Sequence, residues 1–256
     1  MRSPTPIQRR LNELGLRSRL RQRPRLQGRI LAPAGARKRL PSTAGLYFPF
    51  YHDVLPEYAA GLRRHLAAFR ERGPLVAWDT ALEVLTGRRR LDGPTFCLSF
   101  DDGHASWRDV VAPILAEQRV PATFFVATGL VGRPGNLSWA DCRDLLAAGH
   151  TIGSHTITHP RLADCDDETV RREIAGSKKH LEDELGVEIT DFAAPYGNPA
   201  VDVGRREVIA ARESGYRSFA TTSRPAMRVG DSPMWIHRQG LHAAWPLPAV
   251  RTRVHD

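Results

Sequence analysis

The chain has 256 residues, a formal net charge of +9 and three cysteines. This length suits one sizeable α/β domain with a buried core and excludes two such domains joined by linkers. The cysteines lack a C-x-x-C spacing, which excludes a zinc knuckle, and their odd number argues against a disulfide framework. Charged residues and prolines interrupt residues 1–40, and no run of about 18 apolar residues occurs, so neither a secretory signal nor a transmembrane helix is expected. We therefore expect a cytoplasmic protein that is either free or peripheral at a membrane.

Residues 1–44 form an Arg-rich arm that holds the excess positive charge. It contains eleven Arg and one Lys against the single acid Glu13, a formal charge of +11, which leaves −2 for the rest of the chain. Residues 8–23 are predicted to form a short basic helix and residues 23–42 a loop punctuated by prolines. The arm lacks the apolar periodicity needed to pack a core, so it is expected to be flexible or associated with a membrane surface.

Two roles are considered for this arm. Binding to an anionic membrane surface is one, because each basic residue near such a surface contributes about 1 kcal/mol. A tail without a specific partner is the alternative. No nucleic-acid partner is expected, since Lys is scarce in the arm, aromatic residues are not interleaved with the basic ones, and no known binding module is present.

Residues 45–256 are predicted to form a single catalytic domain in which strands alternate with helices. Such alternation predicts a parallel sheet, and polar residues bunched after successive strands predict a site on one rim, as in βα barrels. The predicted strands are residues 45–51, 96–100, 122–128, 151–154, 191–194 and 218–222, and the predicted helices are residues 56–72, 78–85, 107–118, 138–148, 167–185 and 205–214.

Two adjacent acids, Asp101 and Asp102, follow directly on the buried strand at residues 96–100. Neighbouring side chains at a strand end cannot face the same way, so the two carboxylates are expected to take different roles in one pocket. Gly103 permits a tight turn at that point. The alternative is that the triplet is only a βα turn with a helix cap.

His155 and His159 are four residues apart and follow the next predicted strand but one. This spacing brings both imidazoles onto one face if the segment makes a helical turn. Two His and one carboxylate with open positions form a common catalytic set for Zn²⁺ or a similar divalent ion. Structural histidines are the alternative reading of the pair.

Three short motifs in this order resemble the signatures of one known family. They are Ser99-Phe100-Asp101-Asp102-Gly103, His155-Thr156-x-x-His159 and Phe192-Ala193-Ala194-Pro195-Tyr196-Gly197. Together they resemble the polysaccharide deacetylase family, also known as carbohydrate esterase family four, with its NodB-homology domain. The similarity runs from about Tyr51 to His242 and implies a distorted (β/α) barrel, here with a basic N-terminal extension.

The resemblance implies a role for each matching residue. Asp101 would be the general base, and Asp102, His155 and His159 would hold a divalent metal, with zinc expected first and cobalt, manganese or nickel as alternatives. Tyr196 would supply a backbone N–H to the oxyanion. These roles agree with the needs of hydrolysis by an activated water: a base, and donors aimed at the developing negative charge.

Two departures from the family pattern stand out. Many members begin the third signature with an Arg that steadies the base, whereas this chain has Ala193, as does a subgroup that resembles bacterial exopolysaccharide and biofilm deacetylases. The orientation of the base must therefore come from elsewhere. The family's general-acid histidine has no clean counterpart; His237 is the preferred candidate and His242 the other. His52, which resembles the histidine that ends the first strand in relatives, is given no firm role.

The resemblance leads to an expected function. The leading hypothesis is metal-dependent hydrolysis of the N-acetyl group of an amino sugar in a polysaccharide or a lipid-linked glycan. Deformylation or another deacylation of a lipid-linked amino sugar is the closest alternative, since a formyl and an acetyl group differ by one methyl group. A non-catalytic glycan-binding relative is a third hypothesis.

Overall fold

A computed structural model describes residues 44–90 and 92–254 of the chain. The predicted arm, with its helix over residues 8–23 and its loop over residues 23–42, lies outside the described residues apart from Ala44. Within the described part, no helix combines the length and the apolar character required to cross a bilayer.

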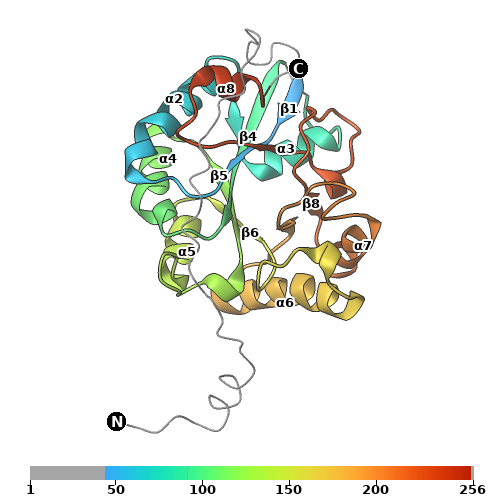
Figure 1. The fold of residues 1–256 in the computed structure, drawn as a ribbon. Coiled ribbons are helices and arrows are strands. Elements are labelled where there is room, and N and C mark those ends of the chain that lie inside the picture. Colours follow the sequence, from blue (N-terminus) through green and yellow to red (C-terminus); the bar gives the residue numbers. More distant parts are fainter. Residues whose placement is uncertain (1–43, 91, 255–256) are drawn as a thin grey trace, which may run out of the picture. The chain divides into compact units, whose positions relative to one another are not determined.

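The described chain is built around one parallel sheet (Figure 1). The strands pair in the order β8-β7-β6-β5-β4-β2-β9, and β1 and β3 pair with the first half of β4. Every strand pair is parallel, so all the carboxyl ends meet on one rim. The strands are β1 (Gly45–Tyr47), β2 (Pro49–Tyr51), β3 (Leu75–Val76), β4 (Pro94–Asp102), β5 (Ala122–Val126), β6 (Thr151–Ser154), β7 (Asp191–Ala193), β8 (Ser218–Ala220) and β9 (Gln239–Gly240).

A short segment around β9 joins the two edges of the curved sheet. On one side, the Ile236 N–H donates to the Phe219 carbonyl at 2.8 Å, beside β8. On the other side, along β2, the Gln239 N–H donates to the Phe48 carbonyl at 3.0 Å and the Leu241 N–H donates to the Phe50 carbonyl at 2.8 Å. The sheet is thereby closed into a distorted barrel, which confirms the fold class predicted from the sequence.

Most helices flank the outside of the sheet, whereas the buried side chains of α3 belong to the interior cluster described below (Figure 1). The longest, α6, begins after the cap Asp166, whose carboxylate accepts from the Thr169 N–H at 2.7 Å, and ends at Gly186, which has a φ of +67°. Ser138 and Asp141 form a capping box at the start of α5. The helices are α2 (Ala59–Arg70), α3 (Trp78–Leu85), α4 (Ala112–Gln118), α5 (Trp139–Ala147), α6 (Asp167–Leu185), α7 (Arg205–Glu213) and α8 (Leu247–Arg251).

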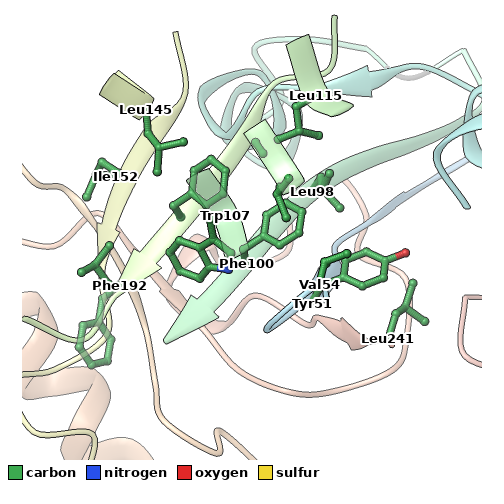
Figure 2. Packing of buried hydrophobic residues seen from close by; sticks show 14 of the residues in the cluster. Tyr51, Val54, Leu98, Phe100, Trp107, Leu115, Leu145, Ile152, Phe192 and Leu241 are labelled. Atoms are coloured by element: carbon green, nitrogen blue, oxygen red, sulfur yellow. The ribbon is translucent and has the colours of Figure 1, made fainter. Parts of the chain in front are cut away.

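Alternate residues of β4 enter two separate hydrophobic cores. Phe96, Leu98 and Phe100 pack outward under the helices, in the larger cluster that also holds Trp107 (Figure 2). Cys97 faces the barrel interior, in the smaller cluster that Trp78 of α3 also enters. Ser99 and Asp101 continue the row of Cys97 into the interior, where Arg238 contacts both, whereas Asp102 lies at the end of the strand on the rim.

Most predicted elements are present, with shifted ends. The predicted strand over residues 45–51 is divided into β1 and β2, and the predicted helix over residues 107–118 begins with a π turn at Trp107–Val111 before α4. Among the strands and α-helices, β3, β9 and α8 were not predicted. They are two to five residues long, too short for a periodic pattern, and their tertiary neighbours hold them in place.

Candidate metal centre and active site

Three predicted ligands converge where β4 and β6 end. One potential ligand atom from each of Asp102, His155 and His159 lies within 4.8 Å of the others. The Asp102 Oδ1 atom is 3.4 Å from His155 Nε2 and 3.1 Å from His159 Nε2. One carboxylate and two imidazoles at this spacing are a donor set typical of Zn²⁺ and related divalent ions.

The loop after β6 brings the histidines together without a helical turn. Residues 155–160 are not helical, so the helical turn anticipated from the four-residue spacing is wrong. Instead Thr156 and His159 adopt left-handed backbone conformations, with φ values of +68° and +61°. The His159 N–H donates to Thr156 Oγ1 at 3.1 Å. Such φ values are uncommon outside glycine and cluster at functional sites, where surrounding contacts hold them.

Contacts around the cluster leave the metal-facing atoms available. His155 Nδ1 lies 2.7 Å from the Ala193 carbonyl, so this nitrogen carries the proton and Nε2 keeps its lone pair for a metal. Asp102 Oδ2 is bonded by His104 Nε2 at 3.2 Å. Its other oxygen, Oδ1, is buried and has no properly directed hydrogen-bond donor among the described residues. A shared cation would satisfy that atom, so the donor set fits a divalent metal.

The electrostatics of the cluster favour a charged carboxylate. Burial opposes ionisation of Asp102, but the neighbouring imidazoles of His104, His155 and His159 outweigh it and hold the pKa of this carboxyl well below its ordinary value. Burial lowers the pKa of His159, but the nearby carboxylates of Asp102 and Asp101 outweigh it, so this pKa is raised. A proton therefore competes with a metal for His159.

Glu173 of α6 anchors the loop that carries both histidines, and the sequence analysis missed it. Its Oε2 accepts from the Ile157 and Thr158 N–H groups, each at 2.8 Å, and its Oε1 accepts from Thr158 Oγ1 at 2.8 Å. The residue is only 4% exposed, so these bonds satisfy a buried carboxylate. The only sequence signal was an acid on the apolar face of a helix, beside Ile174.

Asp101 is held by a buried arginine from the other end of the chain. Arg238 Nη1 and Nη2 donate to Asp101 Oδ1 and Oδ2 at 2.7 Å each, and the two side chains are 0% and 3% exposed. The guanidinium also lies 4.4 Å from the Phe50 ring centroid and 5.2 Å from that of Phe125. A bidentate pair of this kind fixes the plane of the carboxylate and leaves further lone pairs free to accept a proton.

Arg238 explains how the chain tolerates Ala193. The Ala193 side chain is fully buried in the interior cluster, beside Phe125 and Ile236. Its side chain is a single methyl group that cannot bind a carboxylate, and Arg238 reaches Asp101 from the segment that closes the barrel. The arginine that the resemblance expects on β7 is thus replaced in space by one next to β9. The sequence analysis required such a replacement but did not identify it.

Tyr196 lies beside the cluster in a constrained turn. Its ring centroid is 5.4 Å from that of His159, and its φ is +60°. Thr222 holds the turn, since its Oγ1 donates to the Tyr196 carbonyl at 2.9 Å and its N–H to the Gly197 carbonyl at 2.8 Å. Within residues 44–90 and 92–254 the Tyr196 N–H has no hydrogen-bond acceptor, so it is free to donate to a ligand.

The two acid candidates from the sequence do not join the cluster. Among the described residues, neither His237 nor His242 forms a hydrogen bond or an ion pair with Asp101 or the three predicted ligands. The His237 N–H contacts Met227 Sδ at 3.2 Å, and the His242 ring packs against Tyr58 at 5.2 Å between centroids.

His52, at the end of β2, lies closer to the chemistry. The pKa of His52 is lowered below its ordinary value, chiefly by desolvation and also by nearby histidines, although the charges of Asp101 and Asp102 act to raise it. Its side chain is nevertheless solvent-exposed. Trp107 Nε1 fixes the His52 carbonyl at 2.8 Å.

Comparison with known proteins gives a consistent result. The family model for polysaccharide deacetylase matches residues 88–218, which include Asp101, Asp102, His155, His159 and Tyr196. A chitooligosaccharide deacetylase of Rhizobium leguminosarum bv. trifolii is 43% identical over 86 residues, 32% of this chain and 37% of that protein. Another from Sinorhizobium fredii is 34% identical over 113 residues, 43% of this chain and 50% of that protein.

A solved structure extends the similarity beyond the matched motifs. The structure of IcaB from Ammonifex degensii has a TM-score of 0.72 and 26% identity, and the match covers 84% of this chain and 99% of that one. The sequence matches to the curated relatives are shorter, since the chain spans between 37% and half of their length.

Proposed function

Because this chain belongs to the polysaccharide deacetylase family, we propose that it removes the N-acetyl group from an amino sugar in a polysaccharide or lipid-linked glycan, and that the reaction depends on a divalent metal. The observation that carries this proposal is the cluster of Asp102, His155 and His159 next to the buried pair of Asp101 and Arg238. A base, a metal-ligand set and a free backbone donor meet at one rim, as amide hydrolysis requires.

Asp102, His155 and His159 would hold the metal, with zinc the first expectation and cobalt, manganese or nickel the alternatives. When bound, the ion supplies acidification of the attacking water and polarisation of the acyl carbonyl. The orphaned Asp102 Oδ1 supports this assignment, as does the hydrogen bond that leaves His155 Nε2 unprotonated. Because both groups are already oriented, less conformational entropy is lost when a metal binds.

Asp101 would act as the general base. Arg238 holds its carboxylate through one lone pair on each oxygen, so a remaining lone pair can take the proton from water. The water oxygen then bonds to the acyl carbon, and the Tyr196 N–H donates to the oxygen that becomes negative. Cleavage of the C–N bond releases acetate, and the sugar nitrogen takes a proton to leave as an amine.

The source of that last proton has three candidates. His237 and His242 are the candidates from the sequence, and His52 is added because it lies within the electrostatic reach of Asp101 and Asp102. Each is replaced singly by Gln in the assay below. The true acid is the one whose loss lowers kcat and removes the alkaline limb of the pH–rate profile while metal binding is unchanged.

The substrate is tested by offering the purified chain a panel of N-acetylated and N-formylated amino sugars and their oligomers, with Zn²⁺ added after chelation. Acetate release supports the proposal, and release of formate alone selects the deformylase. Neither product despite stoichiometric metal binding directs the search to lipid-linked substrates. Neither product and no metal binding favours a non-catalytic glycan-binding relative.

For residues 1–44 we propose a separate role as an arm that associates with an anionic membrane surface, next to a catalytic domain over residues 45–256. Its formal charge of +11 supports this, since each basic residue near such a surface contributes about 1 kcal/mol. A substrate on the cytoplasmic face of the membrane would be consistent with it. Deletion of residues 1–40 should weaken sedimentation with anionic vesicles and leave turnover of a soluble substrate unchanged. Equal vesicle binding by both forms would remove this role.

A further inference from the structure

Two rim loops that carry catalytic groups are joined by one charged bridge. The loop after β6 carries His155 and His159, and the loop after β7 carries Tyr196. Arg161, two residues after His159, directs its Nη1 at Asp202 Oδ1 in the second loop, where the two atoms form a close hydrogen-bonded ion pair. The Asp202 side chain is 6% exposed, so the pair is largely shielded from solvent on the carboxylate side.

The bridge continues from Asp202 into the turn at Tyr196. Asp202 Oδ2 accepts from the Asn198 N–H at 3.0 Å, and the Asp202 N–H donates to the Asn198 carbonyl at 2.8 Å. The Arg161 guanidinium carbon lies 4.8 Å from the Tyr196 ring centroid, and the His159 ring centroid lies 5.4 Å from it. The side chain of Tyr196, 52% exposed, therefore contacts both a metal-ligand candidate and the bridge.

This arrangement bears on the proposed oxyanion donor. The Tyr196 N–H is useful only if it points at the reacting oxygen, and misplacement by about 1 Å costs about 100-fold in rate. Tyr196 has a left-handed φ of +60°, which a non-glycine residue keeps only where its surroundings enforce it. Thr222 fixes the Tyr196 and Gly197 carbonyls, and Asp202 fixes Asn198, the next residue of the turn, and links it to Arg161 in the metal-ligand loop.

We propose that Arg161 and Asp202 are positioning residues that set the Tyr196 N–H relative to Asp102, His155 and His159. The inference rests on the function proposed above. Arg161 does not need to touch substrate for this role, because its charge is already matched by Asp202 and by Asp164, whose Oδ2 is 3.7 Å from its Nε. Loss of the bridge should lower the rate of the chemical step and spare both substrate binding and metal binding.

The test compares Asp202→Asn with the matched control Asp164→Asn in the full chain. Both changes remove a carboxylate partner of Arg161, but only Asp202 reaches the turn at Tyr196. Asp202→Asn should lower kcat on an N-acetylated chito-oligosaccharide by about 10–100-fold with KM within about twofold. The Zn²⁺ affinity should stay unchanged, and Asp164→Asn should resemble wild type in every measurement. Arg161→Lys, which keeps the charge, should recover part of the rate that Arg161→Ala loses.

A second readout does not depend on activity. The backbone order parameter of the Tyr196 amide should fall from about 0.85 in wild type to below about 0.6 in Asp202→Asn, while that of His155 is retained. An unchanged order parameter would overturn the proposal, as would a loss that appears in KM alone or in Zn²⁺ affinity. An inactive wild-type chain whose Tyr196 amide still loosens in Asp202→Asn would contradict the proposed function and leave the bridge supported.

Discussion

Asp101 and Asp102 are neighbours in β4, yet the structure surrounds them in opposite ways. The Asp102 side chain is 17% exposed at the rim and is bonded only by histidines, which a metal can replace as partners. Asp101 is 3% exposed inside the barrel and is bonded by an arginine that cannot lose its charge. Strand alternation separates the two carboxylates, and the backbone of Asp102 also leaves the regular strand conformation, with a φ of +90°. One short motif thus presents two carboxylates in different environments, which suit a metal ligand and a base.

The largest effects are expected from substitutions that remove the base or a metal ligand separately. Asp101→Asn should reduce turnover by about 10²–10⁴-fold, because Asn cannot accept the proton, while metal binding is retained. His155→Ala should lose both turnover and metal, since it removes a ligand. Metal content by mass spectrometry and acetate release, measured on the same samples, distinguish the two. Equal metal loss in both variants would contradict the division of roles.

Loss of the buried ion pair between Asp101 and Arg238 should have a large effect on stability. Arg238→Ala leaves the Asp101 carboxylate buried without its partner and should lower the free energy of unfolding by about 3–5 kcal/mol. Urea unfolding followed by circular dichroism measures the change. A loss below about 1 kcal/mol would mean that Asp101 is not held by this pair.

A double substitution tests whether an arginine at another position can replace Arg238. Adding Ala193→Arg to Arg238→Ala places the arginine on β7, the position that the family resemblance expects, in an interior that has lost the Arg238 side chain. Part of the lost stability and activity should return if what matters is a cation on Asp101. Ala193→Arg alone is the control and should be destabilising, because it overfills a packed interior. No rescue in the double variant would show that the segment near β9 is required for another reason.

The two sides also differ in what the sequence could predict. Asp102, His155 and His159 lie in short motifs next to apolar strands, so local spacing indicated a carboxylate and two imidazoles, and the family resemblance then selected Asp102 as the ligand. Arg238 is 137 residues away from Asp101, and only closure of the barrel brings the two together. Neither β9, which is two residues long, nor the acid Glu173 inside a charged helix has a local signal strong enough to be noticed. The parallel α/β barrel was predictable because its longer elements alternate regularly.

A smaller effect is expected from the anchor of the metal-ligand loop. Glu173→Ala should lower metal affinity by about 10–100-fold, the range typical for residues that orient ligands. Glu173→Gln is the matched control: its amide oxygen can accept from the Ile157 and Thr158 N–H groups and its NH₂ can donate to Thr158 Oγ1. Isothermal titration with Zn²⁺ should therefore show a near-native affinity for the Gln variant. Equal losses in both would mean that the charge of Glu173 matters and its geometry does not.

The smallest expected effect is the pH dependence of metal binding, which tests how Asp102 influences His159. A metal needs neutral His159, whose pKa is raised above the ordinary value of about 6.5, chiefly by Asp102 against the opposing effect of burial. Lowering the pH increases the protonated fraction, so affinity should fall by up to about tenfold per pH unit, beginning at a higher pH than for an ordinary imidazole. Titrations in buffers of different ionisation enthalpy should show proton release on binding. A constant affinity between about pH 8 and pH 6 would contradict the raised pKa.

The most direct test of the central claim is acetate release from an N-acetylated chito-oligosaccharide by the full chain, measured as purified, after chelation and after addition of one equivalent of Zn²⁺. Metal-dependent hydrolysis predicts that activity disappears on chelation and returns with the metal in wild type. In Asp101→Asn the metal should bind without restoring activity. Activity that survives complete removal of the metal would contradict the proposed role of Asp102, His155 and His159.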